Sequence, residues 1–153
     1  MSGDFPAGRP EGARSIDEIL ADARARLSRV TPEQAFAESR AGAVLIDIRP
    51  AWMRAADGEI PGSVVIERNH LEWRLDPESD ARLPLAVGYD VRAIVICQEG
   101  YTSSLAAAAL LDLGLARATD VDGGYRAWQE AGLPTARPEE KSVTIAPGAG
   151  PAF

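Results

Sequence analysis

The chain contains a single cysteine, Cys97, and a single histidine, His70, among its 153 residues. One cysteine cannot form an internal disulfide, and this favours a reducing, cytoplasmic compartment. One cysteine and one distant histidine are also too few ligands for a typical metal site, so we expect no metal or other cofactor. The first residues lack the charged and then apolar pattern of a secretion signal, and no apolar run is long enough for a transmembrane helix. We therefore expect a cytoplasmic protein that does not bind a membrane.

Basic residues are scarce relative to acidic ones. The sequence has 16 Lys and Arg against 23 Asp and Glu, which gives a formal net charge of −7. This balance argues against a nucleic acid partner, whose binding requires clustered positive charge. Hydrophobic residues make up 46% of the chain, enough for an ordinary globular core, and the length fits one domain with short extensions. The composition and the charge balance favour no particular oligomeric state.

The stretch from Ala93 to Ala106 carries the strongest local signal. Ile94 to Ile96 are apolar and mostly β-branched, which predicts a buried strand that ends at Cys97. A short polar loop follows, and its Gly100 allows a tight turn. Ser103 and Ser104 then precede an apolar run, so we expect them to cap a helix over residues 105–113.

This arrangement predicts a reactive thiol. The first backbone N–H groups of a helix lack intrahelical partners, and a loop that curls around a sulfur there can direct several N–H groups at it and stabilise the thiolate. The alternative is a buried, inert cysteine that packs as a small apolar side chain. We favour the nucleophile, because inert cysteines rarely lie in a polar loop between a strand and a helix.

Three motifs in this stretch and around it resemble one known family. The loop matches the form C-x-x-G-x-[ST]-S, with Cys97, Gly100, Thr102 and Ser103 in place. Before it stand the segments LIDIR (45–49) and GEIPGS (58–63), and after it stands GGYRAW (123–128). In this order the motifs resemble those of the rhodanese-like sulfurtransferases over about Thr31 to Pro134. The resemblance implies that Cys97 is catalytic and that the following loop stabilises a persulfide or anion: Gln98, Glu99, Gly100, Tyr101, Thr102 and Ser103.

The loop departs from many members of that family, which carry Arg or Lys beside the cysteine. Here the corresponding residues are Gln98, Glu99 and Tyr101, and a glutamate would oppose an anionic donor such as thiosulfate. Position 103 is Ser, whereas a C-x5-R phosphatase loop needs an Arg there to bind phosphate in a bidentate manner. The sequence therefore argues against a phosphatase.

The domain limits follow from composition and from helix signals. Residues 1–14 predict a disordered lead, and residues 15–29 predict a helical extension with a capping box at Ser15 and Glu18. That extension either packs on the domain, which we favour, or mediates self-association. Residues 30–136 form the rhodanese-like domain and residues 137–153 a flexible tail.

Strands and helices alternate through the domain, which predicts an α/β fold with a small, mostly parallel sheet of about five strands and helices on both faces. We expect the strands at Val30 and at residues 43–48, 63–66, 91–97 and 118–121. A second helix should begin at Thr31-Pro32, with proline at its first position. The active site of such a sheet lies beyond the carboxyl ends of its strands.

Several charged residues follow strands at that edge. Asp47 and Arg49 point to one face, and we expect Asp47 to support the structure while Arg49 either pairs with it or holds an anionic substrate. Arg68 is our other candidate for a substrate contact. His70 could serve as a base, but a stabilised thiolate needs none. The Gly123-Gly124 turn with Trp128 is expected to be structural.

These observations predict a sulfurtransferase that moves sulfane sulfur from a small donor, such as thiosulfate or 3-mercaptopyruvate, to a thiol or other nucleophilic acceptor through a persulfide on Cys97. Two alternatives stay open. One is a catalytically weak rhodanese module used for binding or regulation, and the other is a redox sensor that uses Cys97 alone.

Overall fold

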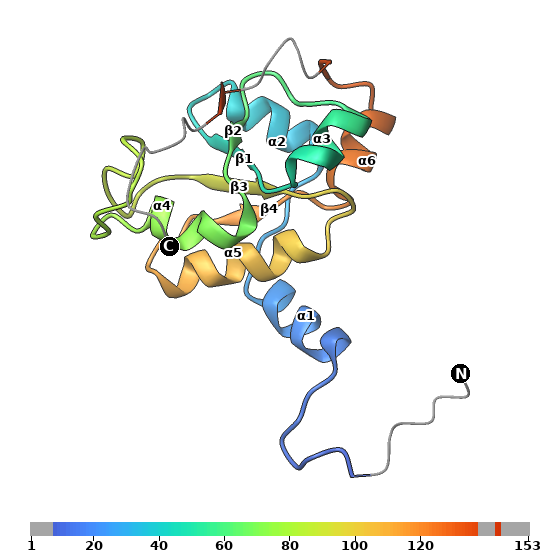
Figure 1. Ribbon diagram of the computed structural model, residues 1–153, viewed down its shortest axis with the longest axis vertical. Helices are drawn as coiled ribbons and strands as arrows, with labels where there is room; N and C mark the ends of the chain where they lie inside the picture. Colours follow the sequence, from blue (N-terminus) through green and yellow to red (C-terminus); the bar gives the residue numbers. More distant parts are fainter. Residues whose placement is uncertain (1–7, 138–142, 145–153) are drawn as a thin grey trace.

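The computed structural model describes residues 8–137 and 143–144. Five parallel strands form one sheet in the order β4-β3-β1-β2-β5 (Figure 1). The strands are β1 (Val44–Asp47), β2 (Val64–Val65), β3 (Ala93–Ile96), β4 (Thr119–Asp120) and β5 (Val143–Thr144). The expected α/β fold with a small parallel sheet is confirmed.

Four of the strands lie where the sequence predicted them, and the fifth does not. The expected strand at Val30 is reduced to a single bridge with Val121, because Thr31 already caps the next helix and leaves one residue free to pair. The fifth strand is β5, which pairs with β2 and belongs to the segment expected to be a flexible tail. Residues 138–142 and 145–153 of that tail lie outside the described residues. Of the expected disordered lead, residues 1–7 also lie outside them, and residues 8–14 are exposed.

Helices cover both faces of the sheet, as expected. On one face, α2 (Pro32–Ser39) and α6 (Gly124–Glu130) pack over Leu45 and Ile94. On the other face, α4 (Leu71–Leu75) and α5 (Thr102–Asp112) pack around a second apolar cluster (Figure 1). The alternation of side chains along each strand divides the core in this way. Within residues 8–137 and 143–144, no helix is long and apolar enough to cross a membrane.

Two elements follow the carboxyl ends of β1 and β2. The helix α3 (Ala51–Asp57), which the sequence pattern did not indicate, comes after β1, and the 3-10 turn η1 (Arg68–His70) comes after β2. Both lie on the side of the sheet where Cys97 follows β3, which is where the site was expected.

The N-terminal extension is a helix that packs on the domain. Helix α1 (Ile16–Ala25) begins with the predicted capping box, in which Ser15 and Glu18 bond each other's backbone N–H. It lies against α5, on the side of α5 away from the sheet (Figure 1). Ala23 is the buried residue of this helix, whereas Ile16 is 63% and Ile19 is 41% exposed. The last turn of α1 therefore makes the closer contact with the domain.

Candidate active site

Cys97 lies at the carboxyl end of β3, and the following loop curls around its sulfur. The backbone N–H groups of Gly100 and Ser103 donate to Sγ at N···S distances of 3.2 and 3.4 Å. The side chain is only 5% exposed. Backbone dipoles thus point their positive ends at the sulfur, an arrangement that stabilises negative charge on it. The loop geometry is the one that the sequence predicted.

The first turn of α6 holds this loop from outside. The carbonyl of Cys97 accepts from the N–H of Tyr125 at 2.8 Å, and the carbonyl of Gln98 accepts from the N–H of Arg126 at 3.1 Å. A Cβ at Gly124 would lie 2.6 Å from the Cys97 carbonyl oxygen, so only glycine permits this approach. The Gly123-Gly124 turn, expected to be purely structural, therefore shapes the site, and its proximity to the loop had no signal in the local sequence.

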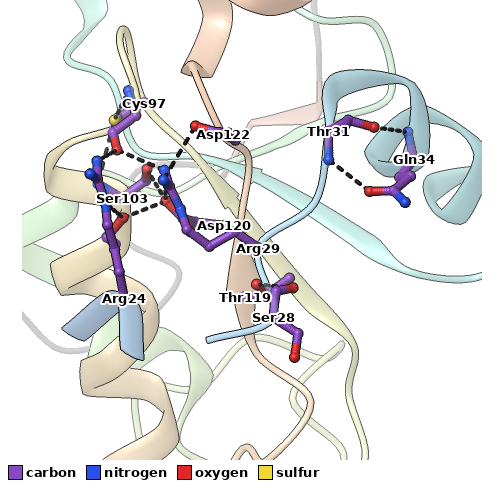
Figure 2. Close-up of polar contacts among 12 residues, drawn as sticks. Arg24, Ser28, Arg29, Thr31, Gln34, Cys97, Ser103, Thr119, Asp120 and Asp122 are labelled. Atoms are coloured by element: carbon purple, nitrogen blue, oxygen red, sulfur yellow. Dashed lines mark hydrogen bonds and ion pairs between the residues drawn. The ribbon is translucent and has the colours of Figure 1, made fainter. Parts of the chain in front are cut away.

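Helix α5 begins earlier than the sequence predicted. Its first residue is Thr102, and its N-cap is Tyr101, which makes no side-chain capping bond. The expectation that Ser103 and Ser104 cap the helix was wrong, because both lie inside it. Their hydroxyls donate instead to Oδ2 of Asp120 at 2.7 and 2.8 Å, since that fully buried carboxylate on β4 requires donors (Figure 2).

Asp47 and Arg49 form a buried pair that supports the site. The guanidinium of Arg49 donates to both carboxylate oxygens of Asp47, with Nη2 2.8 Å from Oδ2, and the two side chains are 0 and 1% exposed. It also donates to the Gly58 carbonyl at 2.9 Å and to Oε1 of Gln98 at 3.2 Å. These bonds correct the expectation that Arg49 could hold a substrate, because its donors are used inside the protein.

The ring of Tyr125 completes this support. The Arg49 guanidinium lies 4.0 Å from the ring centroid, which is a cation–π contact. The Tyr125 hydroxyl donates to the Asp57 carbonyl at 2.8 Å, and burial raises the pKa of this tyrosine above its ordinary value. Tyr125 therefore connects α6 to the end of α3 with its hydroxyl protonated.

Glu99 lies in an ion pair at the surface of the loop. Its Oε2 is 2.8 Å from Nε of Arg126, and the side chains are 53 and 63% exposed. Neighbouring Gln98 donates from Nε2 to Oδ2 of Asp57 at 2.7 Å. The loop sequence suggested an unopposed negative charge at Glu99, and it held no signal for a partner 27 positions away.

Arg68 and His70 lie on η1, after the carboxyl end of β2 as expected. Nη1 of Arg68 pairs with Oε1 of Glu72 at 2.8 Å, and the Arg68 side chain is 37% exposed. The pair joins residues one helical turn apart and leaves part of the guanidinium accessible to solvent. The role of Arg68 as a substrate contact stays a prediction.

Comparisons with known proteins agree with the motifs and with the fold. A family model for the Rhodanese-like domain matches residues 31–131. The thiosulfate sulfurtransferase GlpE of Stutzerimonas stutzeri (strain A1501) is 38% identical over 101 residues, which cover 66% of this chain and 84% of the relative. GlpE of Pseudomonas entomophila (strain L48) is 35% identical with the same coverage.

Solved structures show the same architecture. A protein of unknown function from Rhodopseudomonas palustris CGA009, described as a possible tyrosine phosphatase, is 33% identical with a TM-score of 0.73 and covers 84% of this chain and 99% of its own. A thiosulfate sulfurtransferase from Pseudomonas aeruginosa shares the fold, with a TM-score of 0.65 and 23% sequence identity. The match covers 83% of this chain and 23% of that protein. From the matched domain, the similar relatives and the fold together, we conclude that the chain belongs to the rhodanese-like sulfurtransferase family.

Proposed function

We propose that the protein transfers sulfane sulfur from a small donor to a thiophilic acceptor, with Cys97 carrying the sulfur as a persulfide. The observation that carries this proposal is the loop around Cys97, whose Gly100 and Ser103 N–H groups lie 3.2 and 3.4 Å from Sγ. A persulfide is an anion, and backbone N–H groups directed at it stabilise its charge without rearrangement. The relatives named thiosulfate sulfurtransferase make thiosulfate the first donor to test, with 3-mercaptopyruvate as the second.

The reaction requires two substitutions at sulfur and no oxidant. The Cys97 thiolate attacks the sulfane sulfur of thiosulfate, the S–S bond of the donor breaks, and its electron pair leaves with sulfite. With 3-mercaptopyruvate the thiolate attacks the thiol sulfur, the C–S bond breaks, and its electron pair leaves with the enolate of pyruvate. An external thiolate or similar nucleophile then attacks the terminal sulfur of the persulfide and regenerates the Cys97 thiolate. The acceptor is external because the chain has one cysteine and cannot resolve the persulfide internally. A single cysteine also fits the reducing cytoplasm in which we place this reaction.

Intact mass spectrometry tests the proposal directly. After incubation with thiosulfate or 3-mercaptopyruvate, we expect the full-length protein to gain the mass of one sulfur atom and to lose it when dithiothreitol is added. The Cys97→Ser variant should gain nothing, because a serine hydroxyl is a poor nucleophile at neutral pH, while its circular dichroism spectrum should match that of the wild type. Sulfur uptake by Cys97→Ser, or none by the wild type with either donor, would refute the proposal.

The same samples separate the other functions considered. A binding or regulatory module would take up no sulfur, whereas a redox sensor would gain oxygen on Cys97 with peroxide and no sulfur from either donor. The Rhodopseudomonas protein described as a possible tyrosine phosphatase makes hydrolysis of p-nitrophenyl phosphate a useful control. We expect none from this chain, because Ser103 stands where the phosphate-binding Arg of a C-x5-R loop is required.

A further inference from the structure

Two arginines from the N-terminal extension reach the loop that surrounds Cys97. Nη2 of Arg24, in the last turn of α1, donates to the carbonyl oxygen of Gly100 at 2.7 Å, and Nη2 of Arg29 donates to the same oxygen at 2.9 Å. Figure 2 shows the two arginines beside Cys97. Both residues precede the domain matched by the family model, which begins at residue 31. The family pattern therefore does not account for these contacts.

Other bonds hold each guanidinium in place. Nε and Nη2 of Arg29 bind the two oxygens of the buried Asp120 at 2.9 and 3.1 Å, and Nη1 lies 3.2 Å from Asp122. Burial by itself lowers the pKa of Arg29, but the bonds to Asp120 outweigh this effect and raise the pKa overall. Arg29 is therefore a permanent cation that is 17% exposed.

Arg24 is fixed by a different set of partners. Its Nε donates to the Ser104 hydroxyl at 3.1 Å, and its guanidinium lies 5.5 Å from the ring centroid of Tyr101. Ser104 in turn donates to Asp120, so both arginines belong to one network that ends at the Gly100 carbonyl.

The direction of that carbonyl affects the sulfur. Gly100 donates its own N–H to Sγ of Cys97 at 3.2 Å, so the two arginine bonds to its carbonyl restrict the orientation of a residue that binds the sulfur. The carbonyls of Cys97 and Gln98 are likewise engaged outside the loop, by the first turn of α6. With these three carbonyls held outside, the positive ends of the loop dipoles remain available to the sulfur.

We propose that Arg24 and Arg29 are positioning residues for the reaction at Cys97, and that the N-terminal extension is therefore part of the active site. They act through the Gly100 carbonyl and do not touch the sulfur themselves. Loss of either bond gives Gly100 more freedom to move, and because its N–H binds the sulfur this weakens the stabilisation of the thiolate and the persulfide. The catalytic meaning of this arrangement rests on the proposed function of Cys97, whereas the effect on the loop does not.

The test compares three arginines of the same segment in the full-length protein. Arg24→Gln and Arg29→Gln each remove a donor to Gly100. Arg26→Gln is the matched control, because Arg26 lies between them in the sequence but pairs with Asp112 in an exposed ion pair. Removal of Arg29 leaves the buried Asp120 short of donors and could unfold the protein. In that case Arg24→Gln carries the test alone, because its bonds are to a hydroxyl and a carbonyl.

The first measurement is the second-order rate of Cys97 alkylation by iodoacetamide, a neutral reagent that does not respond to the overall charge. The second is the rate of sulfur uptake from saturating thiosulfate, followed by intact mass. We expect Arg24→Gln and Arg29→Gln to slow both rates by up to about tenfold, which corresponds to about 1.4 kcal/mol. Arg26→Gln should match the wild type.

A conservative variant separates positioning from general support of the fold. Arg24→Lys retains a cationic donor for the Gly100 carbonyl but loses the fork that also binds Ser104, so we expect it to recover most of the lost rate. Wild-type rates in both Gln variants, or equal slowing by Arg26→Gln, would overturn the proposal. Failure of Arg24→Lys to recover any rate would overturn it as well.

The two proposals fail in different ways. If the wild type takes up no sulfur, the proposed function is wrong, and the alkylation rates still decide whether the arginines control the loop. If sulfur uptake occurs and both rates are insensitive to Arg24 and Arg29, the function stands and the positioning role is wrong.

Discussion

At the scale of single residues, the charge beside Cys97 differs from what the loop sequence suggested. Glu99 lies two positions after Cys97, the proposed nucleophile, and would repel an anionic donor if it stood alone. Its pairing with Arg126 at 2.8 Å offsets that charge while leaving both side chains more than half exposed. Exposed ion pairs contribute little to stability, so this pair matters more for the local potential than for the fold.

We predict that Glu99→Gln raises kcat/KM for thiosulfate, because it removes a negative charge and leaves Arg126 unopposed beside the donor. The gain should be severalfold and at most about tenfold, which corresponds to about 1.4 kcal/mol. It should be smaller for 3-mercaptopyruvate, which carries one charge, and it should shrink with added salt. Steady-state kinetics with both donors at two ionic strengths give the measurement.

Glu38→Gln provides the matched control. Glu38 also pairs with an arginine, Arg92, but at the amino end of β3, the opposite end from Cys97. Arg126→Gln should change thiosulfate kinetics in the opposite direction from Glu99→Gln. Unchanged or reduced thiosulfate turnover in Glu99→Gln would mean that this carboxylate does not set the potential at the donor.

At the scale of secondary-structure elements, the proposed active site is the junction of β3, α5 and α6. The strand delivers Cys97, the start of α5 supplies the Ser103 N–H, and the start of α6 binds the carbonyls of Cys97 and Gln98. The junction needs α6 to approach the loop within van der Waals distance, and Gly124, with φ +61°, makes this possible.

We predict that Gly124→Ala reduces sulfur transfer at least tenfold. Its Cβ would lie 2.6 Å from the Cys97 carbonyl oxygen and 2.7 Å from the Gly100 nitrogen, and both are backbone atoms of the cysteine loop. The loop must therefore shift, and the Gly100 N–H that binds the sulfur moves with it.

Gly132→Ala separates this clash from backbone strain. Gly132 also has a left-handed conformation, φ +73°, but a Cβ there meets nothing within 4 Å. It should lose about 1–2 kcal/mol of unfolding free energy and keep its rate of sulfur transfer. If the two variants lose activity equally, the approach of α6 to the loop is not what positions the sulfur.

At the scale of the whole molecule, one buried ion pair links segments that lie far apart in the sequence. Arg49 and Asp47 are essentially inaccessible to solvent, and Arg49 contacts the end of α3 through Gly58, the cysteine loop through Gln98 and α6 through Tyr125. The pair therefore couples the stability of the fold to the geometry of the site.

We predict that Arg49→Met lowers the unfolding free energy by about 3–5 kcal/mol, because it leaves the Asp47 carboxylate buried without its cation. Arg92→Met, which breaks a more exposed pair with Glu38, should cost about 0–1 kcal/mol. Urea unfolding measures both losses, provided that the unfolding free energy depends on urea concentration with the same slope in the variants as in the wild type. A further Asp47→Asn substitution should restore part of the stability of Arg49→Met. If Arg49→Met and Arg92→Met lose the same unfolding free energy, the buried pair of Arg49 and Asp47 does not contribute more to the fold than the exposed pair.

The sequence by itself determined most of the elements and the place of Cys97 after a buried strand. The β-branched run before Cys97, the capping box at Ser15, the proline after Thr31 and the glycine of the loop act through neighbours within a few residues, so their local effect survives in any fold. Together with the other apolar segments of the domain, they predicted α1, α2 and four of the strands, and the motifs pointed to the family.

Only the tertiary structure decided which polar side chains meet. Ser103 and Ser104 bind Asp120 in place of capping a helix, Arg49 is buried, and Arg24 and Arg29 reach Gly100 across more than 70 positions. Each of these contacts exists because a buried carboxylate or carbonyl requires a donor, and the donor comes from whichever segment the packing brings near. Local sequence carries no record of that proximity, and for this reason the residues that hold the cysteine loop could not be read from the motif that contains it.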